Sequence, residues 1–301
     1  MKIVVFLLSS MLLFLVGCSN GASETNEVDS ITHIHDMAFD RESDGELFIG
    51  THHGLLKIDV HTNEMQWQGT ADDHHDFMGF SITADNVFLT SGHPHDLEKF
   101  KDPLGFMVSE DQGETWDFKS LYGEVDFHLI EVNEGNSDFI YGFDAYNQQL
   151  SVSTDGGEKW NIASANGIEG RFNELYTITS DPNNPEIILA GMGDGIYQSD
   201  DQGESFTLLN NELTMTSVSQ RSDGTLLAHG IGRIEGLIVS EDNGETWEPI
   251  GELPTDDPVM AMTVDHQHEE RIVIGTASDS VYMSEDLGET WTTLVEDGKP
   301  K

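Results

Sequence analysis

Short apolar segments recur along the chain from Ile31 onward, and clusters of Gly, Asn, Asp and Ser separate them. ELFIGT from Glu46, GLLKID from Gly54 and GLIVS from Gly236 are examples. Segments of this length that are rich in β-branched and aromatic residues and bounded by turn residues predict β-strands. About 270 residues follow the first 30, enough for one large domain with a substantial core. We therefore expect a single all-β domain over residues 31–301.

Five segments share the pattern Ser-x-Asp-x-Gly followed by an aromatic residue. They are SEDQGETW from Ser109, STDGGEKW from Ser153, SDDQGESF from Ser199, SEDNGETW from Ser240 and SEDLGETW from Ser284. Their starts are 41 to 46 residues apart. This period suits four short antiparallel strands per unit, which is the size of a β-propeller blade.

One unit upstream lacks this pattern but keeps the four strands, as ITHIHDMAFD, ELFIGT, GLLKID and MQWQG. The count is then six units, which predicts a six-bladed β-propeller; seven blades are the alternative if a loop hides another. The first unit starts on its innermost strand and the last one ends on WTTL. The ring can therefore close without an exchange of strands between the termini.

The repeated turn resembles the Asp-box, or BNR, repeat of sialidases, sortilin-type receptors and related bacterial propeller lipoproteins that are often labelled glycosyl hydrolases. The resemblance implies a structural turn on the propeller face away from the ligand site. Ser and Asp side chains can bond local backbone amides there, and Gly can adopt a positive φ. We therefore assign no catalytic role to the box aspartates, which are Asp111, Asp155, Asp201, Asp242 and Asp286. Lys159 and Phe206 depart from the usual box residues.

The first 30 residues read as a leader and a tether. Lys2 precedes the apolar run IVVFLLSSMLLFLV, which is shorter than the roughly 20 residues that span a bilayer. LVGC, ending at Cys18, resembles the bacterial lipobox. The resemblance implies a signal peptide over 1–17, lipidation of Cys18, a flexible tether over 18–30 and an extracytoplasmic protein anchored to the cell membrane. A plain secretory signal with an incidental cysteine is the alternative.

Charge and cysteine content exclude several functions. The chain has 13 Lys and Arg against 56 Asp and Glu, a net charge of −43, which repels nucleic acid and anionic lipid headgroups. Cations gain from this field, although most of it is explained by solvation of an extracytoplasmic surface. Cys18 is the only cysteine, so disulfides, thiol catalysis and iron–sulfur sites are excluded from the domain. We expect no organic cofactor.

Ten of the 13 histidines fall on one face of the predicted propeller. In this fold the innermost strand of each blade lines the channel, and the loops that enter it share a face with the loops that leave the second strand. Those at the starts of inner strands are His33, His35, His74, His75 and His128, and those after second strands are His52, His53, His93, His95 and His229. His61, His266 and His268 fall on the opposite face.

This face is our candidate metal site. Alignment of HIHDMAF with HHDFMGF puts Met37 over Met78, and Met262 falls at the same place. Imidazole with thioether suits copper, whereas imidazole with carboxylate suits zinc. The candidate ligands are His33, His35, His74, His75, His52, His53, His93, His95, Met37 and Met78, with Asp36, Asp76 and Asp96 as carboxylates on the same face. The alternative is that these histidines bond loop carbonyls and that the methionines fill the core.

Two other functions stay open. Sialidases hold the sugar carboxylate with an arginine cluster, and this chain places Arg41, Arg221 and Arg271 on the opposite face, so we do not expect sialidase activity. A different glycoside hydrolase needs two carboxyls of unlike pKa. The carboxylates available for it on the ligand face are Asp36, Asp76, Asp126, Asp144, Glu174 and Asp194. A scaffold that binds an envelope protein is the third possibility. Binding of a transition metal, copper or zinc, or of a small ligand through the His/Met/Asp-rich face is the function we predict first.

Overall fold

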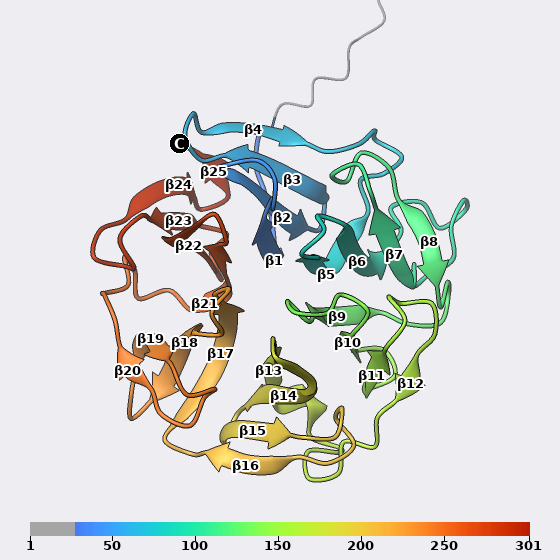
Figure 1. Cartoon of the computed structure of the whole chain (residues 1–301). Coiled ribbons are helices and arrows are strands. Elements are labelled where there is room, and N and C mark those ends of the chain that lie inside the picture. Colours follow the sequence, from blue (N-terminus) through green and yellow to red (C-terminus); the bar gives the residue numbers. More distant parts are fainter. Residues whose placement is uncertain (1–27) are drawn as a thin grey trace, which may run out of the picture.

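The computed structural model describes residues 28–301, and these form six antiparallel sheets arranged as blades around a central channel (Figure 1). The prediction of a six-bladed β-propeller is confirmed, and the seven-bladed alternative is wrong. The signal peptide, Cys18 and most of the tether lie outside the described residues and stay predictions. Between residues 28 and 301, no helix has the length and hydrophobicity needed to cross a membrane.

Each blade is a meander of consecutive strands. Blade 1 contains β1 (Ile34–Phe39), β2 (Glu46–Thr51), β3 (Gly54–Asp59) and β4 (Glu64–Trp67). Blade 2 contains β5 (Asp76–Ile82), β6 (Phe88–His93), β7 (Phe106–Ser109) and β8 (Asp117–Ser120). Blade 3 contains β9 (Phe127–Val132), β10 (Ile140–Asp144), β11 (Gln149–Ser153) and β12 (Asn161–Ile162).

The second half of the ring repeats this pattern. Blade 4 contains β13 (Leu175–Asp181), β14 (Asn184–Met192), β15 (Gly195–Ser199) and β16 (Thr207–Asn210), preceded by the short 3-10 helix η1 (Phe172–Glu174). Blade 5 contains β17 (Leu213–Gln220), β18 (Leu226–Gly232), β19 (Gly236–Ser240) and β20 (Glu248–Pro249). Blade 6 contains β21 (Val259–Asp265), β22 (His268–Thr276), β23 (Val281–Ser284), β24 (Thr292–Glu296) and β25 (Lys299–Pro300).

The ring closes where blade 6 meets blade 1, near the C-terminus in Figure 1. The Ile31 amide donates to the Gly298 carbonyl at 2.8 Å, and the Asn63 side chain donates to the Lys301 carbonyl at 2.7 Å. Buried residues of both blades, among them Met37 and Val273, form one hydrophobic cluster across this seam. Each sheet contains only consecutive strands, so closure needs no strand exchange.

All six inner strands carry a β-bulge near their first residues, at the same end of the channel. In β1 the pairing to β2 jumps from Ile34 to Asp36, which leaves His35 as the extra residue. The residues that the bulges leave out of register are His35, Met78, His128, Tyr176, Thr216 and Met260, which we call the mouth positions. Bulges re-aim side chains and are common beside functional sites.

This register corrects the alignment made from the sequence. Met37 pairs with Ile49 and Met262 with Ile274 at equivalent places, as expected. Met78, however, falls at the place of His35, and Phe80 falls at the place of Met37. The alignment of Met37 with Met78 is therefore wrong by two residues.

The five Asp-boxes are hydrogen-bonded turns between the third and fourth strands of their blades. In the blade 5 box, the Ser240 hydroxyl donates to Asp242 at 2.9 Å and accepts the Gly244 amide at 2.9 Å. Asp242 also accepts the amide and the hydroxyl of Thr246. The structural role expected for these residues fits this geometry.

Ser240→Ala is expected to lower the free energy of unfolding, because it leaves the buried Gly244 amide without its acceptor. An unsatisfied buried donor costs about 1–3 kcal/mol. Urea unfolding measures the change, with Ser222→Ala on an exposed turn as the control. A loss below about 0.5 kcal/mol, typical of neutral surface changes, would contradict this account of the box.

Candidate functional site

Three kinds of position meet at the end of the channel that carries the bulges, which we call the mouth. They are the mouth positions themselves, the residue just before or at the start of each inner strand, and the residue at the end of each second strand. In blade 2, for example, Asp76 at the start of β5 pairs with His93 at the end of β6. Residues of neighbouring blades can therefore meet there.

The first cluster joins blades 1 and 2, and we call it triad one: His35, His52 and Asp76. His52 Nδ1 lies 2.6 Å from Asp76 Oδ2, and His35 Nε2 lies 3.5 Å from Asp76 Oδ1. The two imidazole rings meet edge to face at 4.7 Å. Burial raises the pKa of Asp76, but the bonds from His35 and His52 outweigh it and hold that pKa below its usual range. Asp76 is therefore an anionic carboxylate between two imidazoles.

The second cluster joins blades 2 and 3, and we call it triad two: His93, Asp126 and His128. His128 Nε2 lies 2.8 Å from Asp126 Oδ2, and His93 Nε2 lies 3.3 Å from the same oxygen. His93 Nδ1 donates to Asp102 at 2.6 Å. The hydrogen bond to Asp126 raises the pKa of His93, and the bond to Asp102 adds to this effect. Together they outweigh burial, which lowers the pKa, and bring it to about 9. Burial raises the pKa of Asp126, but the hydrogen bonds from His128 and His93 outweigh it and lower that pKa to about 2.

The two triads share two of their three places on the propeller, one blade apart. His52 and His93 each stand one residue after the second-strand residue that pairs just before the bulge, and Asp76 and Asp126 each stand one residue before the inner-strand residue of that pair. The third residue comes from a mouth position in both triads, but from different blades: His35 lies on the blade of His52, whereas His128 lies on the blade of Asp126. The shared histidine and aspartate places on adjacent blades make the mouth a candidate two-site centre.

Each triad fits a divalent transition metal. Its three donor atoms lie within 4.8 Å of one another. Zinc takes imidazole nitrogen and carboxylate oxygen at about 2.0–2.2 Å, and catalytic zinc sites use three protein ligands with a fourth position open. In triad two, Asp102 would fix the orientation of the His93 ring from behind, as carboxylates do for metal-bound histidines.

The other predicted histidines lie near the triads but outside them. The His33 amide donates to Asp279 at 2.8 Å, and its ring packs against His52 with centroids 4.4 Å apart. His75 and His95 form a pair with Nδ1 atoms 3.1 Å apart. Burial lowers the pKa of His75 to about 4, so the His75 ring is neutral at pH 7. His53 and His74 line a separate surface pocket beside Trp67.

The predicted methionines and carboxylates are dispersed. Met37 is 3% exposed and packs in the core between blades 1 and 6. This agrees with the alternative that the methionines fill the core. Met78 stands at the mouth. Asp96 accepts the Glu98 amide in its own loop and lies 3.8 Å from Lys99, so it belongs to neither triad. Asp36 points into the channel.

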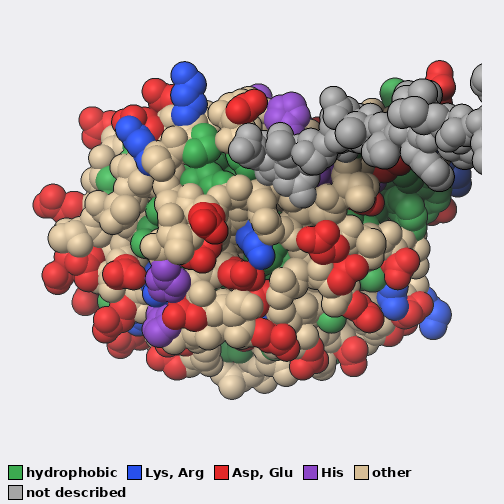
Figure 2. All heavy atoms as spheres, turned by 90° about the horizontal axis from the view of Figure 1, so that it is seen from above, with side chains coloured by type: hydrophobic (Ala, Val, Ile, Leu, Met, Phe, Trp, Pro, Cys, Tyr) green, Lys and Arg blue, Asp and Glu red, His purple; other side chains and the backbone are tan. Residues whose placement is uncertain are grey.

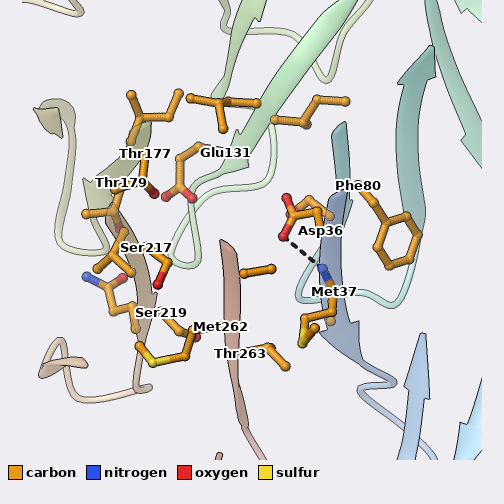
Figure 3. Close-up of a pocket in the computed structure, with 18 of the residues that line it drawn as sticks. Asp36, Met37, Phe80, Glu131, Thr177, Thr179, Ser217, Ser219, Met262 and Thr263 are labelled. Carbon is orange, nitrogen blue, oxygen red and sulfur yellow. Dashed lines mark hydrogen bonds between the residues drawn. The ribbon is translucent and has the colours of Figure 1, made fainter. Parts of the chain in front are cut away.

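The channel below the mouth holds a cavity of about 150 Å³, and Figure 3 shows its lining. Asp36 of blade 1 and Glu131 of blade 3 extend into it from different sides, among hydroxyl side chains that include Ser217 and Thr177. Burial raises the pKa of both carboxyls to about 7, against hydrogen bonds that lower it. The Glu131 carboxylate accepts the Ser180 amide and hydroxyl, both at 2.8 Å.

An ion pair closes the other end of this cavity. Arg41 donates to both oxygens of Glu134, at 3.1 and 2.9 Å, and His266 Nδ1 lies 3.6 Å from Glu134. All three residues line the cavity. The ion pair therefore constricts the channel at the Asp-box side.

Sequence reasoning found triad one but only part of triad two. His128 had been placed on the ligand face and Asp126 among its carboxylates, yet neither was chosen as a metal ligand. The signal was the segment DFH (residues 126–128) at the start of the third inner strand, which combines aspartate with histidine as HIHD and HHD do. Glu131 was missed, although an acidic residue between Ile130 and Val132 is a polar interruption in an otherwise apolar strand.

Comparison with known proteins agrees with the fold. No family model matches the chain. An oligoxyloglucan-reducing end-specific xyloglucanase of Emericella nidulans is 24% identical over 72% of this chain and 33% of its own length. A sialidase of Paraclostridium sordellii is 22% identical over 62% of this chain and 49% of its own length. The chain thus spans between a third and a half of these relatives.

A solved structure supports the same architecture. The GH74 enzyme of Niastella koreensis superimposes with a TM-score of 0.61 at 18% identity, over 89% of this chain and 46% of that one. At this identity the likeness concerns the fold. With the repeated boxes, the six blades and these relatives together, the chain is an Asp-box β-propeller, similar to the sialidase and xyloglucanase propellers.

Proposed function

We propose that the mouth of the propeller binds transition-metal ions, one at each triad. The observation that carries the proposal is the repetition of two histidines and one aspartate, each set within 4.8 Å, on adjacent blades. A chance pairing of histidine with an acidic residue is common on so acidic a chain. Composition alone does not explain that the His52 and Asp76 places of triad one are filled again by His93 and Asp126 in triad two, with a further mouth histidine beside each pair.

The donor atoms select the class of metal. Each triad offers two imidazole nitrogens and one carboxylate, a set that suits zinc or copper better than calcium or magnesium, which prefer oxygen. Acidic side chains dominate the side of the molecule seen in Figure 2, with few basic ones between them. The net charge of −43 attracts any cation to this surface. The negative field thus raises the local concentration of every cation, and the donor atoms of the triads select among the metals.

Elemental analysis of untagged protein tests the proposal. The metal-free protein is dialysed against micromolar zinc, and we expect two zinc ions per chain to remain. A stoichiometry near zero at both pH 7 and pH 8.5 would remove the proposal.

Glycoside hydrolysis is the second candidate, and the comparisons favour it more than they favour metal binding, because both curated relatives have glycoside hydrolase names. Among the described carboxyls, Asp36 and Glu131 are the ones whose pKa rises to about 7. A carboxyl of raised pKa suits the general acid of a glycosidase. The described arginines have dispersed partners: Glu134 for Arg41, Asp194 for Arg171, Glu269 for Arg221, Glu212 for Arg233 and Asp265 for Arg271. They form no sialidase-like cluster.

Hydrolysis assays on xyloglucan oligosaccharides, aryl glycosides and sialosides test this candidate. If the channel carboxyls are catalytic, Glu131→Gln is expected to lower kcat by at least about 100-fold, the usual contribution of general acid–base catalysis. Glu124→Gln, an exposed glutamate, is the control. Wild-type protein inactive on the whole panel, or Glu131→Gln at full activity, would argue against the candidate.

A further inference from the structure

Methionine and histidine alternate along one half of the mouth. The mouth positions of blades 6, 1, 2 and 3 are Met260, His35, Met78 and His128, in that order around the ring. The inner strands of these blades pack against one another in the same order. Met78 therefore stands between the two histidines that the triads take from mouth positions.

The equivalence of the blades places Met78 beside triad two. In blade 1, the side chain at the mouth position, His35, reaches Asp76 of the next blade at 3.5 Å. Met78 holds the same position in blade 2, and Asp126 holds the position of Asp76 in blade 3. The mouth position also lies beside the end of the second strand of its own blade, because the ring centroid of His35 lies 4.7 Å from that of His52, which directly follows β2. In blade 2 that second strand ends at His93.

Packing does not account for these two methionines. Met37 and Met262 are 3% and 5% exposed and belong to hydrophobic clusters of the core. Met260 is 55% exposed, and Met78 is half-buried. Neither belongs to any of the six hydrophobic clusters that the described residues form. An exposed thioether gains little from burial, so its presence at the mouth calls for another explanation.

We propose that Met78 supplies a thioether ligand for Cu(I) at triad two. The inference rests on the proposed metal site and names its metal as copper. Thioether sulfur is a soft donor that favours Cu(I), whereas zinc is satisfied by imidazole and carboxylate. With Cys18 as the only cysteine, methionine is the soft ligand available to the propeller.

Two titrations of the untagged full chain test this inference. Cu(I) affinity is measured without oxygen, with ascorbate present and bicinchoninate as the competing chelator, and zinc affinity is measured separately. Met78→Leu is expected to weaken Cu(I) binding about tenfold or more and to leave zinc binding within about twofold, because only Cu(I) uses the sulfur.

Met37→Leu is the matched control, since the same substitution in the core should change neither affinity. The two proposals fail differently. Zinc binding with equal Cu(I) affinity in wild type and Met78→Leu would overturn the thioether ligand and keep the triads. Loss of both metals in Met78→Leu, with the fold intact by circular dichroism, would also overturn it, because the residue would then act on the site as a whole. No binding of either metal by the wild type would overturn both proposals.

Discussion

His52→Ala is expected to remove one of two zinc ions and leave the other. The substitution deletes a nitrogen of triad one and leaves His93, Asp126 and His128 untouched on the neighbouring blades. Loss of a supporting residue around a metal already costs about 10–100-fold in affinity, so loss of a direct ligand should cost about 100-fold or more. His93→Ala should remove the zinc ion of triad two and leave that of triad one. Isothermal titration of metal-free protein measures both sites.

His53→Ala is the matched control for His52→Ala. It removes the adjacent imidazole, which lies in the other pocket beside Trp67. Zinc binding should match that of the wild type. Equal losses of zinc in His52→Ala and His53→Ala would mean that the surface histidines bind zinc without defined sites, which contradicts one ion at each triad. The double variant His52→Ala, His93→Ala should retain no zinc at micromolar concentration.

Glu131→Gln is expected to raise the free energy of unfolding at pH 8 and to leave it unchanged at pH 4. Burial raises the pKa of Glu131 from 4.5 to about 7. A pKa raised on folding stabilises the folded state fully below pH 4.5 and loses that contribution as the pH rises through 7. Each pKa unit corresponds to about 1.4 kcal/mol, so the gain from a neutral amide at pH 8 is up to about 3 kcal/mol.

Urea unfolding at pH 4, 6 and 8 measures this effect. Gln has nearly the shape of Glu and keeps a side-chain oxygen that can accept a hydrogen bond from Ser180. The substitution therefore preserves the packing of the site and its contact with Ser180. Glu124→Gln, on an exposed glutamate, should give the same stability as the wild type at every pH. A Glu131→Gln variant less stable than the wild type at pH 8 would show that the carboxylate is ionised and well solvated in the channel, which contradicts its raised pKa.

The sequence predicts the architecture well because the fold repeats. Five boxes at a period of 41 to 46 residues leave few folds open, and the box side chains bond within their own turn. The number of blades, the strand order and the closure of the ring follow from such local signals. His35, His52 and Asp76 were also within reach, because propeller topology assigns them to one face.

The sequence could not predict which of these residues converge. A bulge adds one residue to each inner strand, and its place is visible only in the pairing of Ile34 and Asp36 with β2. Without it, Met37 was aligned with Met78, and a core residue was taken for a ligand. The channel carboxyls pose a different problem, since the pKa of Glu131 depends on atoms from other blades that desolvate it. Neither the position of the bulge nor the desolvation of Glu131 can be read from the spacing of residues in the sequence.

Anomalous diffraction at the zinc edge, from crystals of the untagged protein grown with zinc at pH 8, tests the central claim most directly. The account predicts two peaks at the mouth, one between His35, His52 and Asp76 and one between His93, Asp126 and His128. Peaks confined to the Asp-box side would contradict it, for example at Asp44, which lies 3.4 Å from His61 and 3.2 Å from His268. A mouth without zinc in protein that retains the metal in solution would also contradict it.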